Sequence, residues 1–512
     1  MTGRVQLFFL FLLFVSGQCY KILLYSTPMG FSHIQLMESV ASTLHSAGHD
    51  VTVVHPVLEE RFRQYWEKSP VKKVYFEAPK EMVEAHESRT GNIWVTAPLG
   101  GNMRTVLGFM GIQRALCDQV LGETTRIEEL KKEDFDIGMF ELFGPCGLGL
   151  AEILGVKTHI MMSSIGLIDS LAPMFHSPLN PSYVPASMTL NTDKMTFFQR
   201  FINFGWVVLS ETILIHSVNS KYETVFAKHG HEISISEVIK TKTNYILSNS
   251  DDFLDMARPL SRKVKHIGGI VLGKPGNLTS EFNDILSLRS KTIVISFGSV
   301  APTGSMPEVI KSGILKTIEA LPEYTFIWKT DKTDLEIGKG IGNLKTTAWM
   351  PQKELLNDPR VELFVSHAGL NSLLEAARTG TPAILIPIFG DQFKNAAIMA
   401  RKNTSIVIEK DQFSEEIFEN ATISSYSQRA ARLSELMNTR KETPADRLLE
   451  AVEFSGKFQK IHDLDVYGFE LGFVQYFCLD VIAVYILLLT LLLLSISKCF
   501  KWICCRRKVK TD

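Results

Sequence analysis

The segment 363–392 most constrains what this chain can fold into, because strand, turn, helix and strand follow one another within it. An apolar strand at 363–365 leads into a turn at 366–369. Apolar residues at helical spacing then predict a helix, and Gly380 ends it where a left-handed residue is favoured. A second apolar strand, 383–387, follows. This succession is typical of a parallel α/β sheet.

The turn before this helix has the chemistry of a nucleotide site. Unpaired N–H groups and the positive end of a helix attract a phosphate, and His367 and Ser372 add side-chain donors there. Asn371 and Glu375, four residues apart, share the face just inside the turn, so a carboxylate lies where ribose hydroxyls could bind. Each piece taken alone more often reflects plain α/β packing.

Residues on either side of this turn suit the base and the sugar of a nucleotide sugar. Trp349 offers a flat ring on which a base could stack, although a lone tryptophan is more often part of a core. Asp391 and Gln392, at the carboxyl end of the second strand, supply an acceptor and a mixed amide that suit sugar hydroxyls.

The joint order of these residues resembles the donor-binding signature of the UDP-glycosyltransferases, in particular the membrane-bound UDP-glucuronosyltransferases of animals. The pattern W-x-P-Q occurs at 349–352, H-x-G-x-N-S at 367–372, and D-Q at 391–392. Ala368 replaces the commoner glycine and is expected to fit. The resemblance implies donor-binding roles for Ser299, Trp349, Gln352, His367, Gly369, Asn371, Ser372, Glu375, Asp391 and Gln392.

The pattern of residues 21–54 predicts a second ligand-binding turn. Residues 21–25 read as a buried parallel strand, and Ser32 with Gln35 predicts a capping box at the start of a helix. A strand at 51–54 completes a βαβ unit. His33 then lies at the carboxyl ends of the strands, where open α/β sheets bind ligands. A histidine there is more often structural than catalytic, but the resemblance implies that His33 is the general base.

A carboxylate follows the next strand of the first half. Residues 135–141 read as a strand that ends in Glu141, shortly before Pro-Cys-Gly at 145–147. The family has an aspartate at this place, so Glu141 is one methylene longer. The resemblance implies that Glu141 is the acidic partner of His33. The alternative is a solvated acid at a strand end.

Length and pattern predict the architecture. A chain of 512 residues suits two domains, and strands alternate with helices in both halves. We expect an α/β protein of the GT-B class, with two facing doubly wound (Rossmann-like) domains: an N-terminal acceptor-binding domain, 20–275, and a C-terminal UDP-sugar-binding domain, 276–465. Residues 160–235 are rich in Met and aromatic side chains, which usually form core but line the acceptor site in the family. Dinucleotide and P-loop motifs are missing from the expected places, which disfavours dehydrogenases and P-loop enzymes.

The two ends of the chain predict a membrane protein. Residues 1–19 have the pattern of a secretory signal peptide. An apolar segment at 473–497 predicts one C-terminal transmembrane helix, and the tail 498–512 is basic. We therefore expect a single-pass type I protein with lumenal catalytic domains. Lys508 and Lys510 resemble a dilysine retrieval signal, which implies the endoplasmic reticulum membrane.

The charge and the cysteine content limit the classes of partner and cofactor that the chain is expected to bind. A formal net charge of -1 argues against nucleic acid as a partner. No spacing suits a metal site, and no cofactor is expected apart from the UDP-sugar co-substrate. Cys117 and Cys146 are either a disulfide or two buried thiols. Glycosylation sequons begin at Asn277, Asn403 and Asn420.

These features predict one reaction and two alternatives. The chain is expected to transfer glucuronic acid from UDP-glucuronate to a hydroxyl of a small lipophilic acceptor, with inversion and with His33 as the base. The first alternative is UDP-glucose as the donor. The second is an inactive family member that binds a UDP-sugar or a lipophile. A homo-oligomer is compatible with each of them.

Overall fold

The computed structural model describes residues 18–508 except 29, 90–92, 96–99, 188, 274, 300 and 423–425. Most of the predicted signal peptide and the last four residues of the basic tail, which include Lys510, lie outside the described residues. The chain divides into unit 1, residues 1–461, and unit 2, residues 462–512. Each unit is described by itself.

Within the described part of unit 1, seven parallel strands form the first sheet, in the order β3-β2-β1-β4-β5-β6-β7. The strand order reverses between the neighbours β1 and β4, and such a switch point leaves a crevice at the carboxyl ends of the strands. The strands are β1 (Lys21–Tyr25), β2 (Asp50–Val57), β3 (Lys72–Glu77), β4 (Ile137–Glu141), β5 (Thr158–Ser163), β6 (Thr243–Ser248) and β7 (Val264–His266).

A second parallel sheet of six described strands has the order β10-β9-β8-β11-β12-β13, with its switch point between β8 and β11. Both sheets therefore have doubly wound topology. The strands are β8 (Lys291–Ser296), β9 (Tyr324–Lys329), β10 (Leu344–Thr347), β11 (Val361–Ser366), β12 (Ala383–Leu385) and β13 (Ser405–Val407).

Helix α1 (Phe31–Ser46) shows how an apolar stripe sets the first βαβ unit. Its buried side chains include His33, Ile34 and Val40. The predicted capping box of Ser32 and Gln35 is wrong, because the helix begins one residue before Ser32. Gly30 is the N-cap, and its carbonyl accepts the first helical hydrogen bonds.

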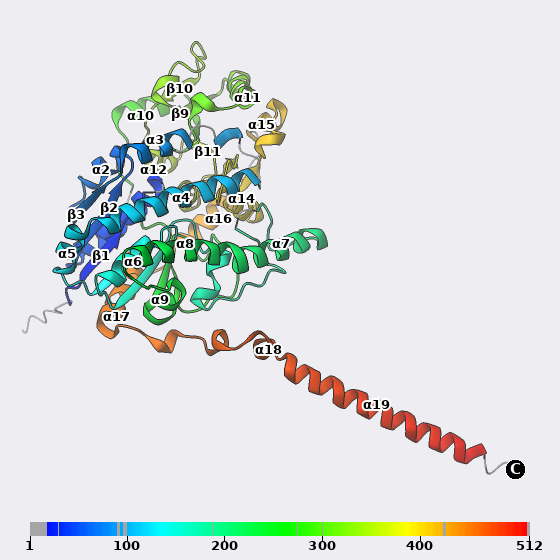
Figure 1. Ribbon diagram of the computed structural model, residues 1–512. Helices are drawn as coiled ribbons and strands as arrows, with labels where there is room; N and C mark the ends of the chain where they lie inside the picture. The colour runs from blue at the N-terminus through cyan, green and yellow to red at the C-terminus, as the bar shows by residue number, and fades with distance from the viewer. Residues whose placement is uncertain are drawn as a thin grey trace, which may run out of the picture. The chain divides into compact units, whose positions relative to one another are not determined.

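The other helices of unit 1 cover the sheets and connect the strands (Figure 1). They are α2 (Glu60–Trp66), α3 (Lys80–Arg89), α4 (Gly100–Gly122), α5 (Thr124–Lys131), α6 (Cys146–Ile153), α7 (Phe197–Leu209), a π-helical turn η4 (Ser210–Leu214), α8 (Ile215–Lys228), α9 (Ile235–Lys242), α10 (Ser280–Leu286), α11 (Glu308–Ala320), α12 (Gln352–Leu356), α13 (Leu370–Thr379), α14 (Gln392–Arg401), α15 (Glu415–Thr422), α16 (Ser427–Asn438) and α17 (Pro444–Phe458).

Helix α17 returns to the first sheet, although it follows the second sheet in the sequence. It lies against β4, β5, β6 and β7. The Asn244 amide donates to Ser455 Oγ at 3.2 Å. A Cβ on Gly456 would lie 2.5 Å from the Tyr20 ring, so glycine is needed for this close approach. The sequence range 276–465 therefore includes a helix that is part of the first domain in space.

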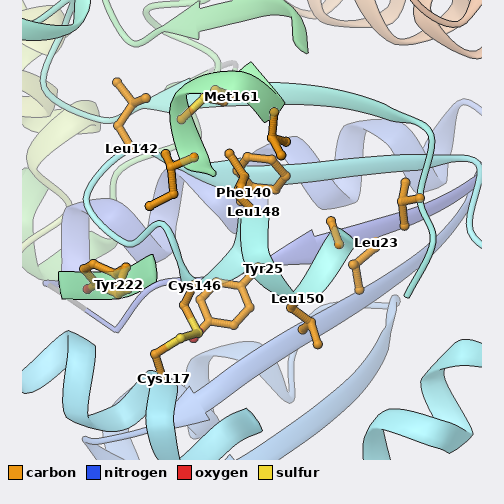
Figure 2. Packing of buried hydrophobic residues seen from close by; sticks show 14 of the residues in the cluster. Leu23, Tyr25, Cys117, Phe140, Leu142, Cys146, Leu148, Leu150, Met161 and Tyr222 are labelled. Atoms are coloured by element: carbon orange, nitrogen blue, oxygen red, sulfur yellow. A yellow bond between two sulfur atoms is a disulfide. The ribbon is translucent and has the colours of Figure 1, made fainter. Parts of the chain in front are cut away.

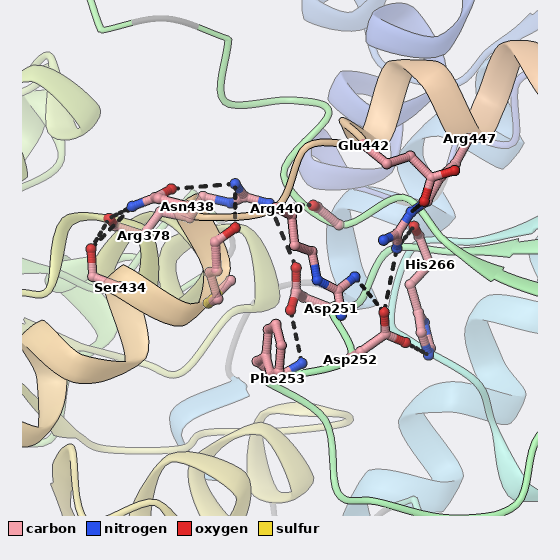
Figure 3. A network of polar contacts seen from close by, with 12 residues as sticks. Asp251, Asp252, Phe253, His266, Arg378, Ser434, Asn438, Arg440, Glu442 and Arg447 are labelled. Carbon is pink, nitrogen blue, oxygen red and sulfur yellow. Dashed lines mark hydrogen bonds and ion pairs between the residues drawn. The ribbon is translucent and has the colours of Figure 1, made fainter.

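A polar network ties the segment after β6 to the helices that follow the second sheet (Figure 3). Arg440 Nη1 lies 2.5 Å from Asp252 Oδ2. Arg447 Nη1 donates to the His266 carbonyl at 3.0 Å, and Arg378 Nη2 lies 3.6 Å from Asp251 Oδ2. These charge-assisted contacts join the carboxyl-terminal ends of β6 and β7 to helices of the second half of unit 1.

A disulfide crosses the core of the first sheet. Cys117 on α4 and Cys146 on α6 are bonded, which settles the alternative that the sequence left open. Figure 2 shows the bridge beside Tyr25 and Tyr222, within a cluster of buried apolar side chains. The bridge fixes α4 close to the carboxyl end of β4, the strand that precedes α6.

Unit 2 contains a short helix, α18 (Phe473–Tyr476), and a long one, α19 (Leu479–Lys508). By length and composition, residues Leu479–Trp502 are a candidate membrane span. The long helix begins later than the predicted residue 473, because Cys478 has a left-handed backbone conformation, with φ 53°, that separates the two helices.

Candidate active site

His33 and Glu141 meet at the switch point of the first sheet. His33 lies in the first turn of α1, directly after β1, and Glu141 is the last residue of β4. Because β1 and β4 are neighbours, their ends place Nδ1 of His33 2.6 Å from Oε1 of Glu141. Glu141 is fully buried, so it is not the solvated acid of the alternative interpretation. An ionised carboxylate can only accept a hydrogen bond, so Nδ1 carries the proton and Nε2 is left as a base.

Opposing effects set the proton affinity of His33. Burial lowers the pKa of His33, but the charge and the hydrogen bond of Glu141, with the charge of Asp391, outweigh burial and raise it. Asp391 follows β12 of the second sheet, whereas His33 and Glu141 belong to the first. The electrostatic coupling therefore joins both halves of unit 1 at His33.

Hydrogen bonds of backbone and amide groups link the His33–Glu141 pair to a residue of the second half of unit 1. The Ser164 N–H lies 3.4 Å from Glu141 Oε1, and the Ser164 carbonyl accepts from the Asn249 amide at 3.1 Å. The same amide donates to Asn371 Oδ1 at 2.9 Å. Ser164 and Asn249 follow β5 and β6, and sequence reasoning did not identify either. A signal was present, since both are polar residues just after apolar strands.

His367 is held in a narrow slot at the start of α13. A Cβ on Gly298 would lie 2.7 Å from the His367 ring, and a Cβ on Gly369 would lie 2.6 Å from its Nε2. The two glycines thus allow the backbone to approach the Cε1 and Nε2 atoms of the ring closely. Burial and the charge of Lys329 lower the pKa of His367 to about 4. The imidazole is therefore neutral at pH 7 and acts as a hydrogen-bonding group rather than a cation.

Lys329 is a functional candidate that sequence reasoning missed. It is the last residue of β9, and its Nζ donates to the Gly298 carbonyl at 3.2 Å. Its pKa is lowered, chiefly by burial. An ammonium group beside the N-terminus of α13 suits a diphosphate. The sequence signal was a lysine directly after the apolar run that ends at Trp328.

A second polar cluster lies one turn inside α13. The Gln352 amide donates to Ser372 Oγ at 3.1 Å and to Glu375 Oε2 at 2.5 Å. Burial raises the pKa of Glu375 to about 7, although the hydrogen bond from Gln352 opposes this shift. The structure therefore brings together three of the predicted donor-site residues, and their carboxyl group titrates near neutrality.

The remaining donor-site residues differ in exposure. Trp349 is 66% exposed, which leaves its ring accessible for stacking, and Ser299 is exposed in the turn after β8. Gln392 is buried, and its Oε1 accepts the backbone N–H groups of residues 388 and 389. Burial raises the pKa of Asp391, and Asn395 donates to its Oδ2 at 2.7 Å.

An apolar cavity opens beside the His33 pair. Its volume is about 1010 Å³, counting the open space at its mouth. Phe143 is part of its wall and packs edge-on against His33, with 5.8 Å between the ring centroids. Met161, Met174 and Trp206 also line it, so part of the Met-rich and aromatic region forms a cavity wall. Its lining is predominantly apolar, as in sites that bind small apolar molecules.

Two further predictions concern glycosylation and metal binding. Asn277, Asn403 and Asn420 are all exposed. Among the residues that the structure describes, no group of three or more His, Cys, Asp and Glu side chains could hold a metal ion.

Similarity to known proteins agrees with this geometry. The family model described as "UDP-glucoronosyl and UDP-glucosyl transferase" matches residues 21–512. The chain belongs to this family. UDP-glucuronosyltransferase 3A1 of Bos taurus is 28% identical over 509 residues, which cover 94% of each chain.

Solved structures of glycosyltransferases share the fold. A glycosyltransferase of kitacinnamycin matches 86% of this chain and 100% of its own length, with a TM-score of 0.59 and 14% identity. UDP-glucose: anthocyanidin 3-O-glucosyltransferase in complex with UDP matches the same shares, with a TM-score of 0.57 and 16% identity. The predicted GT-B fold is confirmed, as is membership of the UDP-glycosyltransferase family. The chain is thus a glycosyltransferase that takes a UDP-sugar donor.

Proposed function

We propose that this enzyme transfers glucuronic acid from UDP-glucuronate to a hydroxyl of a small lipophilic acceptor, with inversion and with His33 as the general base. The observation that carries the proposal is the 2.6 Å contact between His33 and Glu141 next to the apolar cavity. Phe143 contacts His33 and lines the cavity, so an acceptor in the cavity can present its hydroxyl to Nε2.

The first sheet would supply the base, and the second sheet would supply the groups that bind the donor. A hydroxyl is a weak nucleophile at neutral pH, and His33 Nε2 takes its proton as the oxygen attacks the anomeric carbon. The bond from that carbon to the β-phosphate oxygen breaks, and UDP leaves with the electron pair. Glu141 stabilises the imidazolium that forms. Attack opposite the leaving group converts an α-linked donor into a β-glycoside.

On the donor side, the N-terminus of α13 and Lys329 would stabilise the charge on the departing diphosphate. Neutral His367 would donate a hydrogen bond to it. Glu375 would bind the ribose, Trp349 the base, and Asp391 with Gln392 the sugar. Because the Gln392 oxygen is occupied by backbone N–H groups, its amide N–H₂ is the group that would reach the donor.

The name of the bovine relative supports glucuronate as the sugar, and UDP-glucose is the alternative donor. Purified enzyme with a phenol panel should form a glycoside faster from UDP-glucuronate than from UDP-glucose at equal concentration. A higher kcat/KM with UDP-glucose would reverse the donor assignment. No glycoside from either donor with any acceptor would contradict the proposed reaction.

The binding roles assigned to the donor-site residues can be tested by calorimetry. We expect Glu375→Ala to weaken binding of UDP and of UDP-glucuronate by the same factor, because Glu375 is assigned to the ribose. Gln392→Ala should weaken UDP-glucuronate more than UDP. Equal losses of affinity for UDP and UDP-glucuronate in both variants would contradict these assignments.

We further propose that α19 spans the endoplasmic reticulum membrane and that unit 1 is lumenal. The candidate span Leu479–Trp502 and the exposed sequons support this topology. In sealed microsomes, protease should remove only a short tail, and endoglycosidase should shorten the protected chain. A large fragment released without detergent would contradict it.

A further inference from the structure

The apolar cavity beside His33 has in its wall an amide that the protein does not use. Asn219, on α8, lines the cavity and is 7% exposed. Among the residues that the structure describes, no group exchanges a hydrogen bond with its side chain. A carboxamide offers N–H donors and a carbonyl acceptor, and buried polar groups are nearly always paired. An unpaired amide in a cavity wall therefore points to a partner that is not part of the chain.

The hydroxyl and carboxyl side chains that line the same cavity do have partners within the protein. Asp169 Oδ1 accepts from the Ser187 N–H at 2.9 Å and from the Ser187 hydroxyl. The Ser210 hydroxyl donates to the Val207 carbonyl at 3.0 Å. Asn219 differs from these residues because its hydrogen-bonding capacity is left open toward the cavity.

A second buried polar group without a partner lies one helical turn further along α8. Tyr222 is 1% exposed, and its hydroxyl has no hydrogen-bond partner in the described part of the chain. Residues three apart in a helix share a face, so Asn219 and Tyr222 make the same side of α8 polar in successive turns. The Cys117–Cys146 bridge lies beside Tyr222 (Figure 2), which cross-links the wall behind these side chains.

The rest of this helical wall shows that apolar side chains suit the position. Leu214, Ile215 and Val218 also line the cavity. A buried amide without a partner lowers the free energy of unfolding, whereas an apolar residue in its place does not. Such a local cost is expected at a functional site, where a bound molecule supplies the hydrogen bonds.

We propose that Asn219 hydrogen-bonds a second polar group of the acceptor and thereby selects which lipophilic molecules the enzyme prefers. The acceptor class is then a lipophilic ring system with one hydroxyl that reaches His33 and a further hydroxyl or carbonyl that reaches Asn219. Phe143 packs against His33 and lines the same cavity as Asn219, so one ligand can contact both. The role in substrate selection rests on the proposed function, whereas the contact requires only that the cavity binds the molecule.

The preference arises from what a ligand without the second group loses. Such a ligand covers Asn219 and leaves its amide without water and without any other partner. A ligand with the second group pairs with the amide and avoids this cost. The contact therefore adds a chemical selection to the selection by size and fit that an apolar wall provides.

Calorimetry with four biphenyls tests the contact without turnover. The ligands are para-hydroxybiphenyl and three derivatives with an added hydroxyl at the ortho, meta or para position of the other ring. They are titrated into the full-length, detergent-solubilised protein, unmutated and with Asn219→Leu. For at least one derivative, its Kd advantage over para-hydroxybiphenyl should shrink about 10–100-fold in the variant, because a buried hydroxyl then lacks its partner. Comparing ratios of Kd cancels differences in solubility and in partitioning into detergent.

Two further variants make the result specific. Asn219→Ala removes the amide without adding bulk, and it should reduce the Kd advantage as Asn219→Leu does. Ile215→Val is the matched control: Ile215 lines the cavity one turn before Asn219 and has no polar group. It should change the Kd of all four ligands by similar factors. Thermal unfolding checks that each variant is folded, and Asn219→Ala decides the question if Asn219→Leu is not.

Several results would overturn the proposal. One is an unchanged ratio of Kd values in the folded Asn219 variants for all three derivatives. Another is an equal loss of the Kd advantage in Ile215→Val, which would assign the effect to the shape of the cavity. Failure of all four biphenyls to bind the unmutated protein would also overturn the acceptor class.

Glucuronidation of the same ligands separates this inference from the proposed function. With UDP-glucuronate as donor, Asn219→Ala should raise KM for the preferred derivative and change kcat little, because Asn219 binds the acceptor away from the reacting atoms. A preference in Kd that is missing from kcat/KM would overturn the role in substrate selection. A preference in Kd without turnover of any ligand would support the Asn219 contact and contradict the proposed reaction instead.

Discussion

Replacing Glu141 by glutamine tests the proton-transfer pair with little change in shape. The Ser164 N–H lies 3.4 Å from Glu141 Oε1, the same oxygen that contacts His33. A glutamine would therefore keep its amide oxygen in this position, where it accepts from both partners. The Nδ1–H tautomer of His33 is preserved, and what is lost is the negative charge.

The size of the effect follows from the change in hydrogen-bond type. A hydrogen bond to a charged group contributes about 1.5–3 kcal/mol and a neutral one about 0.5–1.5 kcal/mol. The imidazolium that forms in the transition state thus loses about 1–2 kcal/mol of stabilisation. Since 1.36 kcal/mol corresponds to a factor of ten, kcat/KM should fall about 5–30-fold.

The same substitution should move the pH profile in a defined direction. Glu141 supplies two of the three influences that raise the pKa of His33, and burial, which lowers it, remains. A general base works only when deprotonated, so activity of the unmutated enzyme falls as the pH drops through the raised pKa. In Glu141→Gln this inflection should lie at lower pH, and the loss in rate should be smallest in acid.

The assay is UDP release from UDP-glucuronate with a phenol whose own pKa lies well above the range studied. Glu141→Asp is the charge-preserving control, and it should keep the inflection near its original pH even if shorter reach slows the rate. An inflection that stays fixed in Glu141→Gln, or a rate equal to that of the unmutated enzyme at every pH, would refute the role of Glu141.

Three further substitutions probe the donor site and the core. Gly369→Ala should weaken UDP binding by about 10–100-fold in calorimetry, because its Cβ would displace the His367 ring and cost a hydrogen bond to a charged ligand. Glu375→Gln should flatten the pH dependence of UDP affinity, which in the unmutated enzyme should rise with pH through about 7 as the carboxyl ionises. Cys117→Ser with Cys146→Ser should lower the free energy of unfolding by about 3–4 kcal/mol in denaturant titration, given a separation of 29 residues.

Each of these has a distinct control or contrary result. Gly304→Ala introduces a Cβ into open space and should leave UDP binding unchanged. A Glu375→Gln variant whose UDP affinity still rises through pH 7 would place that titration on another group. Equal denaturation midpoints with and without the Cys117–Cys146 bridge would mean that the bond adds nothing to stability.

The sequence predicted the parts of the site that depend on strand order. His33 and Glu141 each follow an apolar strand, and the switch point of a doubly wound sheet brings such ends together. The contact therefore followed from topology, and the extra methylene of Glu141 did not prevent it. Ala368 also fits, but with a φ of 66°, a left-handed conformation that favours the glycine it replaces.

The sequence did not predict features that depend on contacts between distant segments. Asn249 and Lys329 gain their roles from neighbours across the fold, and a polar residue after a strand is common in any α/β protein. The capping box at Ser32 failed because the helix started earlier. The aromatic side chains at 197–204 belong to the region that the sequence predicts as core or, by resemblance, as acceptor-site wall, whereas the fold leaves them exposed.

The return of α17 to the first sheet also has a consequence for biosynthesis. The first sheet is complete in sequence at His266, but the helix that covers β4, β5, β6 and β7 ends at Phe458. At about 5–20 residues per second, a ribosome needs on the order of 10–40 s to make the stretch between them. During that time the nascent first domain lacks a piece of its own surface. A chaperone would then have an apolar area to bind until the last helix emerges, and a chain cut after the second sheet would expose that area permanently.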